Sequence, residues 1–364
     1  MKDLKDLYPI RFKPILSKRV WGGDTLIKDY NKGEEGKSYD EPIGESWDVC
    51  GFEDNSSIIK NGFLAKNDLF SVVEIYMGNL VGDDIYKKYG NEFPLLIKLL
   101  NIEDRLSVQV HPDNLTAFDR HNSYGKTEAW YVLEADENAK IYMGFNKDMS
   151  PNEFYERSKK GTLEEVLNVI KPKKGDFFFI EAGLIHSAQG HLVIAEVQQL
   201  SDVTYRIYDW GRENDPKTRR EMHLDLAFDV INYKKYDKDK YFIPSAETSK
   251  NPHRSPVLTK NEFFSINELA LTDPLHIYID KYKSFILYFC CEGQASIKPY
   301  LPKKGKDQVE ILNKGEWILV PASYDEFLLS PETKGTKVLE VFVPFIEDTK
   351  DDYIDESIPK EIKD

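Results

Sequence analysis

Cysteine is scarce in this chain of 364 residues, which carries only Cys50, Cys290 and Cys291. Adjacent cysteines seldom pair with each other, and one distant thiol cannot build a disulfide framework. A small secreted scaffold held together by disulfides is therefore excluded, and we expect a cytoplasmic protein.

Long apolar runs and a basic excess are also missing. No apolar run reaches the about 18 residues of a membrane span, and Met1–Tyr8 lacks the apolar core of a signal peptide. The 49 basic residues are outnumbered by 63 acidic ones, a formal net charge of −14. Because such a surface repels phosphate backbones, we expect neither nucleic acid nor a membrane as partner. An anionic substrate would need a local basic pocket.

Short apolar runs dominate what is present. Hydrophobic residues make up 41% of the chain and aromatic residues 13%, which is enough for a sizeable core. The strand-like runs are Phe177–Ile180, Leu192–Val197, Thr204–Tyr208, Ser284–Cys290, Trp317–Val320 and Val338–Val343. Turn signals bound them, which predicts a β-sandwich or barrel. Helical spacing behind Asn67 and start signals at Ser150 and Thr162 predict helices added to this β framework.

An internal repeat indicates two copies of one β unit. Gly175–Ala182 and Gly315–Ala322 both read as glycine, an acid, four apolar residues and a turn ending in alanine. Chance similarity between two buried strands is the alternative. We expect residues 1–236 to form a first barrel with the added helices, residues 237–346 a second, degenerate barrel, and residues 347–364 an acidic tail.

Polar side chains alternate with apolar ones along the segment from Leu106 to Asp113. Strand alternation places Ser107, Gln109 and His111 on the face opposite the apolar residues. A half-exposed strand with polar residues outward would look the same. Glu128 at the start of another strand and His186 beyond a third complete a set of two nitrogen and two oxygen donors, which suits zinc, with Mn²⁺, Fe²⁺ or Co²⁺ possible.

A further polar group follows on two later strands. Glu196 lies opposite apolar neighbours on one strand, and Asp202, Thr204 and Arg206 share a face of the next. A surface ion pair between Asp202 and Arg206 is the plainer interpretation. The remaining histidines are expected to be surface groups (His121, His223, His253 and His276) or structural (His191).

Several spaced motifs resemble those of type I mannose-6-phosphate isomerases, in the short bacterial branch. These are Ser107–Asn114, Gly125–Trp130 and Tyr205–Trp210, with further matches at Val20–Gly23 and Ile43–Trp47. The resemblance covers most of the chain and implies a mainly β fold of two cupin-type jelly-roll β-barrels, a zinc site and an aldose–ketose isomerase. Its metal ligands fall on Gln109, His111, Glu128 and His186. Its substrate-site residues fall on Ser107, Lys98, Lys126, Glu196, Asp202 and Arg206.

The resemblance implies interconversion of mannose 6-phosphate and fructose 6-phosphate, in which a proton moves between C1 and C2. Lys126 and Asp202 are the favoured acid/base groups, with Glu196 as a further candidate. Arg206, helped by Lys98, is expected to bind the phosphate. Since the second barrel carries Glu326 where the repeat places His186, one ion per chain is expected. Another cupin metal enzyme, such as an iron dioxygenase, and a non-catalytic sugar-phosphate-binding regulator are the alternatives. The oligomeric state stays open.

Overall fold

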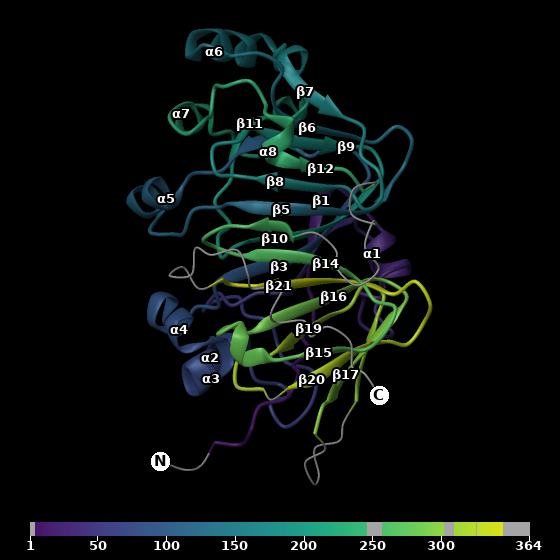
Figure 1. The fold of residues 1–364 in the computed structure, drawn as a ribbon. Coiled ribbons are helices and arrows are strands. Elements are labelled where there is room, and N and C mark those ends of the chain that lie inside the picture. The colour runs from purple at the N-terminus through teal and green to yellow at the C-terminus, as the bar shows by residue number, and fades with distance from the viewer. Residues whose placement is uncertain (1–3, 246–256, 302–308, 325, 345–364) are drawn as a thin grey trace. The chain divides into compact units, whose positions relative to one another are not determined.

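The computed structural model describes residues 4–245, 257–301, 309–324 and 326–344 of a mainly β protein (Figure 1). The expected acidic tail (347–364) and His253 lie outside these residues. The chain divides into two compact units. Unit A comprises Ile15–Trp47 and Leu95–Ser245, and unit B comprises the described parts of Met1–Pro14, Asp48–Pro94 and Ala246–Asp364.

Unit A contains two antiparallel sheets with a core between them. The seven-stranded sheet has the order β1 (Ile15–Gly23), β2 (Ile43–Val49), β3 (Leu95–Ile102), β10 (Leu192–Gln199), β5 (Glu128–Ala135), β8 (Phe177–Ile180), β12 (Phe242–Ile243). The five-stranded sheet has the order β11 (Tyr205–Tyr208), β4 (Val108–Val110), β9 (His186–Gln189), β6 (Lys140–Phe145), β7 (Leu167–Ile170). One buried cluster joins residues of both sheets, among them Ile194 of β10, Trp130 of β5 and Met143 of β6.

The short helices of unit A are α1 (Thr25–Lys28), α5 (Asn114–His121), α6 (Pro151–Lys160), η1 (Leu163–Val166), η2 (Arg212–Asn214), α7 (Leu224–Phe228) and α8 (Lys238–Tyr241). A second apolar cluster packs α6, η1 and α7 against the other face of the five-stranded sheet through Phe154, Leu163 and Ala227. The helix start predicted at Ser150 is confirmed, because its side chain accepts a hydrogen bond from the Glu153 amide. The second helix, predicted at Thr162, is a single 3₁₀ turn.

Unit B also contains two antiparallel sheets around a buried core. Their orders are β13 (Val257–Lys260), β14 (Ser265–Ala270), β21 (Lys337–Phe342), β16 (Ile286–Glu292), β19 (Trp317–Val320), and β15 (Leu275–Ile277), β20 (Phe327–Pro331), β17 (Gln294–Pro299), β18 (Glu310–Asn313). Its helices are α2 (Leu69–Tyr76), α3 (Gly78–Val81), α4 (Asp83–Tyr89) and η4 (Ile279–Lys281). Among the described residues the four sheets are open rather than closed barrels.

The helices α2 to α4 differ from expectation in where they belong. They lie in unit B with the C-terminal sheets, although the sequence pattern assigned them to the first barrel. Backbone hydrogen bonds explain this, because the carbonyls of Asn79 and Leu80 accept from the amides of Ser323 and Ala322. The N-cap is Asp68, whose carboxylate accepts from the Ser71 amide, rather than Asn67.

The repeated segment has the same local backbone pattern in both units. Gly175 before β8 and Gly315 before β19 have φ of +86° and +83°, a region that glycine adopts without strain. The Gly175 amide donates to Val132 and the Gly315 amide to Cys290, each on the strand that pairs with the repeat strand. The repeat therefore marks one supersecondary element used twice.

Candidate active site

The inward face of the seven-stranded sheet changes from apolar to polar along each strand. In β10, Leu192 and Ile194 enter the core, and Glu196 and Gln198 continue the same face. Register places Glu196 opposite Lys98 of β3 and Trp130 of β5. The apolar end of the sandwich therefore fixes strands whose other end presents ionisable groups.

The five-stranded sheet brings a second polar row to the site. Gln109 of β4 pairs with Arg206 of β11 on one side and with His186 of β9 on the other. Val108 and Val110 belong to the apolar cluster on the opposite face of the sheet. The predicted alternation along this strand is therefore confirmed, with the polar residues inward instead of toward solvent.

Three of the four predicted ligands form one buried group. One nitrogen each of His111 and His186 and one carboxylate oxygen of Glu128 lie within 4.8 Å of one another. The Nε2 atoms of His111 and His186 are 3.5 and 3.2 Å from the Glu128 carboxylate. All three side chains are almost fully buried.

The two imidazoles are oriented by backbone carbonyls. Nδ1 of His111 donates to the Val203 carbonyl at 3.0 Å, and Nδ1 of His186 donates to the Leu184 carbonyl at 2.9 Å. Because a carbonyl only accepts, the proton is held on Nδ1 and the Nε2 lone pair faces Glu128, as in metal-binding histidines. Nε2 of His111 and both oxygens of Glu128 are buried without a hydrogen-bond partner. These orphaned donor atoms fit a divalent cation.

The fourth predicted ligand lies beside this group. Gln109 places its amide nitrogen 3.2 Å from Nε2 of His186, while its oxygen accepts from the Ser107 hydroxyl at 3.2 Å. Ser107 is thus brought to Gln109, but it is fully buried and is not among the side chains that line the cavity.

Charge around the group favours an ionised Glu128. Burial alone would raise the pKa of its carboxyl, but the Lys126 ammonium 3.3 Å away and the two imidazoles bring the pKa well below its usual range. Burial and the Lys126 cation lower the pKa of His111 well below its ordinary value. A neutral imidazole beside a carboxylate is the state in which both bind metal.

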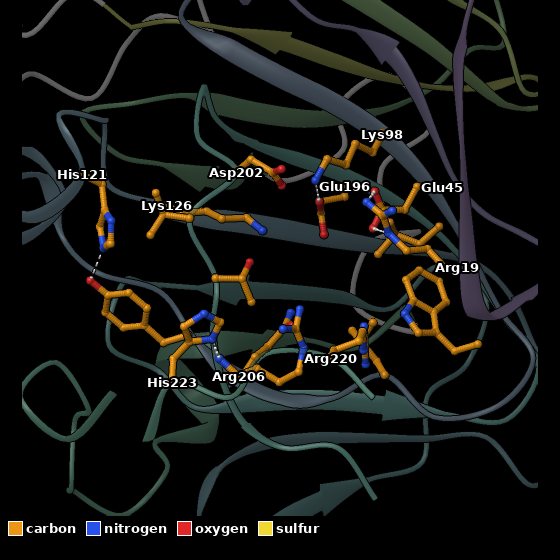
Figure 2. Close-up of a pocket in the computed structure, with 17 residues that line it drawn as sticks. Arg19, Glu45, Lys98, His121, Lys126, Glu196, Asp202, Arg206, Arg220 and His223 are labelled. Carbon is orange, nitrogen blue, oxygen red and sulfur yellow. Dashed lines mark hydrogen bonds and ion pairs between the residues drawn. The ribbon is translucent and has the colours of Figure 1, made fainter. Parts of the chain in front are cut away.

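A cavity of about 490 Å³ opens beside this group (Figure 2). Every predicted substrate or acid/base residue except Ser107 lines it: Lys98, Lys126, Glu196, Asp202 and Arg206. No ion pair joins Asp202 to Arg206 among the described residues, and Arg206 instead donates to the Glu221 carbonyl at 2.7 Å. The surface-pair interpretation of these two residues therefore fails.

Glu196 and Lys98 form a buried ion pair on the cavity wall. Nζ of Lys98 is 3.3 Å from Oε1 of Glu196, and the Trp130 indole donates to Oε2 at 2.8 Å. Burial and then repulsion by the Glu128 carboxylate raise the pKa of Glu196, which Lys98 partly offsets. Although burial acts against it, the carboxylates of Glu196 and Glu45 raise the pKa of Lys98 above its usual value.

Several residues that line the cavity were not predicted from the sequence. Arg19, Glu45 and Arg220 line the cavity, and Arg19 binds Glu45 through two nitrogens at 3.0 Å each. Glu45 lies in a motif that carried the family resemblance, which was the available signal. Arg19 and Arg220 belong to no periodic pattern in the sequence that would have predicted their place in the cavity.

Of the histidines expected on the surface, His121 is exposed as expected, His223 is only partly exposed, and His276 is buried, so the interpretation of His276 was wrong. His121 and His223 both line the cavity, where His121 contacts the Tyr205 hydroxyl at 2.8 Å and Nδ1 of His223 accepts from the Arg206 amide at 3.2 Å. His276 of β15 is buried in unit B and lies 2.8 Å from Glu326. Polar neighbours in the sequence do not reveal which side of a cavity wall a residue faces. His191, expected to be structural, pairs with Glu103 at 2.9 Å.

Comparisons with known proteins identify the family. Residues 10–147 match the catalytic domain of phosphomannose isomerase type I. The mannose-6-phosphate isomerase of Streptococcus mutans is 30% identical over 324 residues, which cover 86% of this chain and 92% of that protein. One from Bacillus subtilis is 30% identical over 329 residues, covering 88% of this chain and 95% of that protein. The crystal structure of the mannose 6-phosphate isomerase from Bacillus subtilis superposes with a TM-score of 0.78 at 26% identity, over 92% of this chain and 99% of that one. The chain therefore belongs to the type I phosphomannose isomerase family.

Proposed function

We propose that this chain is a metal-dependent aldose–ketose isomerase that interconverts mannose 6-phosphate and fructose 6-phosphate through a cis-enediol(ate). The observation that carries the proposal is the buried His111, Glu128 and His186 group beside a cavity lined by acid/base and cationic side chains. Membership of the phosphomannose isomerase family supplies the substrate.

The metal is zinc, one ion per chain, held by Gln109, His111, Glu128 and His186, with Mn²⁺, Fe²⁺ or Co²⁺ as alternatives. Two nitrogen and two oxygen donors support this choice. Gln109 joins the set once its amide turns its oxygen toward His186. When bound, the ion supplies Lewis-acid stabilisation of the negative charge that develops on the substrate oxygens at C1 and C2.

Proton transfer between C1 and C2 falls to Lys126 and Asp202, with Glu196 as a further candidate. All three line the cavity, so each can reach a bound sugar. Lys126 adjoins the metal-binding group through Glu128. Glu196 is buried with a raised pKa, as expected of a carboxyl that exchanges protons near neutral pH. Arg206 binds the phosphate and Lys98 completes the substrate site. Ser107, which does not line the cavity, acts through its hydrogen bond to Gln109.

The architecture is proposed to be two cupin-type jelly-roll β-barrels, the first catalytic and the second degenerate. Support comes from the repeated element at β8 and β19 and from the paired sheets of each unit. Among the described residues, the candidate metal group lies in unit A. No helix in the described part of the chain is long and apolar enough to cross a membrane. A cytoplasmic location is proposed from the scarcity of cysteine, three residues in 364.

A coupled assay tests the proposal, with fructose 6-phosphate as substrate and mannose 6-phosphate as measured product. We expect turnover that chelation abolishes and added zinc restores. A metal-loaded protein without isomerase activity would contradict the proposal. Oxygen uptake with ferrous ion would instead favour the dioxygenase alternative, and sugar-phosphate binding without turnover would favour a regulator.

A further inference from the structure

Arg220 presents a rigidly held guanidinium to the cavity beside Arg206. Its Nε and one terminal nitrogen donate to the two oxygens of Asp209, which is fully buried. A guanidinium has five N–H groups, so this pairing leaves three donors on the other edges. Because Arg220 lines the cavity, these donors are available to a bound ligand. Figure 2 shows Arg206 and Arg220 next to each other on one wall, across from Lys98 and Glu196.

Positive charge is in excess at this wall. Asp209 also pairs with Arg212 at 2.8 Å, and Arg212 has a second carboxylate partner in Asp104 at 2.9 Å. Two carboxylates thus serve Arg212 and Arg220, and within the described part of the chain the guanidinium of this wall that has no carboxylate partner is that of Arg206. Arg206 donates to a neutral carbonyl, and its Nε has no partner. Burial, followed by repulsion from Arg220, lowers the pKa of Arg206 to about 10. Clustered, partly buried cations of this kind are stabilised by an anion placed between them.

The cations of the opposite wall are matched by carboxylates. Lys98 pairs with Glu196, and Arg19 binds Glu45 through two nitrogens. Lys126 pairs with Glu128. These three pairs leave the Arg206 and Arg220 wall as the place in the cavity where a dianion finds uncompensated charge.

We propose that Arg220 is the second cation of the phosphate clamp, binding the phosphoryl group together with Arg206, and that Asp209 is the positioning residue that holds Arg220 in place. This inference rests on the proposed sugar-phosphate activity and deepens it. From the sequence, Lys98 is expected to help Arg206 bind the phosphate. This role falls to Arg220 instead, because Lys98 already forms an ion pair with Glu196.

The test uses inorganic phosphate as the probe and measures how tightly it binds. Two readouts are used: its inhibition constant against fructose 6-phosphate turnover, and its binding to the metal-loaded protein by calorimetry. Arg220→Met should weaken phosphate binding and raise KM about 10–100-fold, the loss expected for charge-assisted hydrogen bonds. The kcat should change less than about threefold, since the reacting carbons are untouched. Arg220→Lys should fall between, because it keeps the charge and loses the fork. It also serves if the methionine variant does not fold.

Arg212→Met is the matched control. It removes the same charge and a contact with the same Asp209, together with a pair to Asp104, but Arg212 does not line the cavity. We expect phosphate binding within about threefold of wild type. If Arg212→Met weakened phosphate binding as much as Arg220→Met, the effect would come from general charge and the inference would be overturned. Phosphate binding by Arg220→Met at wild-type strength would also overturn it.

The role of Asp209 is tested by a double-mutant cycle. Asp209→Asn should weaken phosphate binding in the wild type and add almost nothing in the Arg220→Met background, because it acts through Arg220. Additive losses would contradict a positioning role. If the wild type fails to isomerise fructose 6-phosphate, the proposed function fails, and the calorimetric measurements still decide on the clamp. If turnover is normal and Arg220→Met changes nothing, the clamp alone fails.

Discussion

Replacing His186 with alanine removes one imidazole from the proposed metal site and tests that site without touching the cavity cations. Removal of a residue that only supports a ligand weakens metal affinity about 10–100-fold. Because His186 itself is a proposed ligand, its removal should weaken metal affinity by more than this. Its Nε2 lies 3.2 Å from Glu128, and its Nδ1 is fixed by the Leu184 carbonyl. No other described histidine or acid joins His111 and Glu128 in a candidate metal group, so no replacement is at hand.

The magnitude follows from linkage between binding and folding. With free zinc at one hundred times the wild-type dissociation constant, binding stabilises the wild type by about 2.7 kcal/mol. A 100-fold weaker site at the same zinc concentration is half filled and gains only about 0.4 kcal/mol. The His186→Ala variant should therefore lose about 2 kcal/mol of zinc-dependent stabilisation, beyond any difference between the two metal-free proteins.

The assay compares denaturant unfolding with and without zinc and counts bound metal by atomic spectroscopy. The wild type should bind about one ion per chain. His191→Ala is the control, since His191 is about one-third exposed and pairs with Glu103 outside the group. It should keep the full zinc-dependent gain. A His186→Ala protein that binds zinc with wild-type affinity would refute the metal site, and two tightly bound ions per wild-type chain would refute the single-site reasoning.

Three further changes separate proton transfer, phosphate binding and stability. Lys126→Met should lower kcat by about 10² or more in the coupled assay while the metal count stays unchanged, and near-normal turnover would move the role to Asp202 or Glu196. Arg206→Ala should cost about 2–4 kcal/mol in kcat/KM for fructose 6-phosphate and much less for unphosphorylated fructose. A change within about 1 kcal/mol for both sugars would contradict a role for Arg206 in phosphate binding. Burial alone would raise the pKa of Glu45, but Lys98, Arg19 and the Trp47 indole together lower it to about 2. The ionised Glu45 carboxylate therefore stabilises the fold above the unfolded-state pKa near 4.5, and this stabilisation is lost as pH falls toward 2. Between pH 4.5 and pH 2 the unfolding free energy of Glu45→Gln, measured by urea unfolding, should fall by about 2–3 kcal/mol less than that of the wild type. Identical pH dependence of the two unfolding free energies would contradict the depressed pKa of Glu45.

The strands and part of the metal site could be predicted because both depend on local periodicity. The six strand-like runs all correspond to strands, and alternation correctly puts Gln109 on the face opposite Val108 and Val110. What alternation cannot supply is the pairing of distant strands. Glu128 and His186 meet because β5 and β9 belong to sheets that share one core, and that is a property of topology rather than of either segment.

Residues outside regular strands were the ones missed. Arg220 lies between η2 and α7, where no periodicity fixes the direction of a side chain, and its place in the cavity depends on Asp209, eleven positions earlier. The helices α2 to α4 show the same limit at a larger scale. Their apolar spacing predicts a buried face, but any apolar surface could cover it. Backbone hydrogen bonds to the segments after β19 and before β16 tie them to unit B.

The arrangement of charge in the cavity also sets the direction in which a sugar phosphate can lie. Near the candidate metal group the lysines have carboxylate partners, in the pairs Lys126–Glu128 and Lys98–Glu196. A phosphate dianion placed there would compete with those carboxylates and gain little. At Arg206 and Arg220 it meets one guanidinium that donates to a neutral carbonyl and another whose carboxylate partner, Asp209, is shared with Arg212. If the proposed clamp and metal site hold, a chain with a net charge of −14 binds its anion in one orientation, with the phosphoryl group at the arginine wall and the reacting carbons toward the candidate metal group of His111, Glu128 and His186.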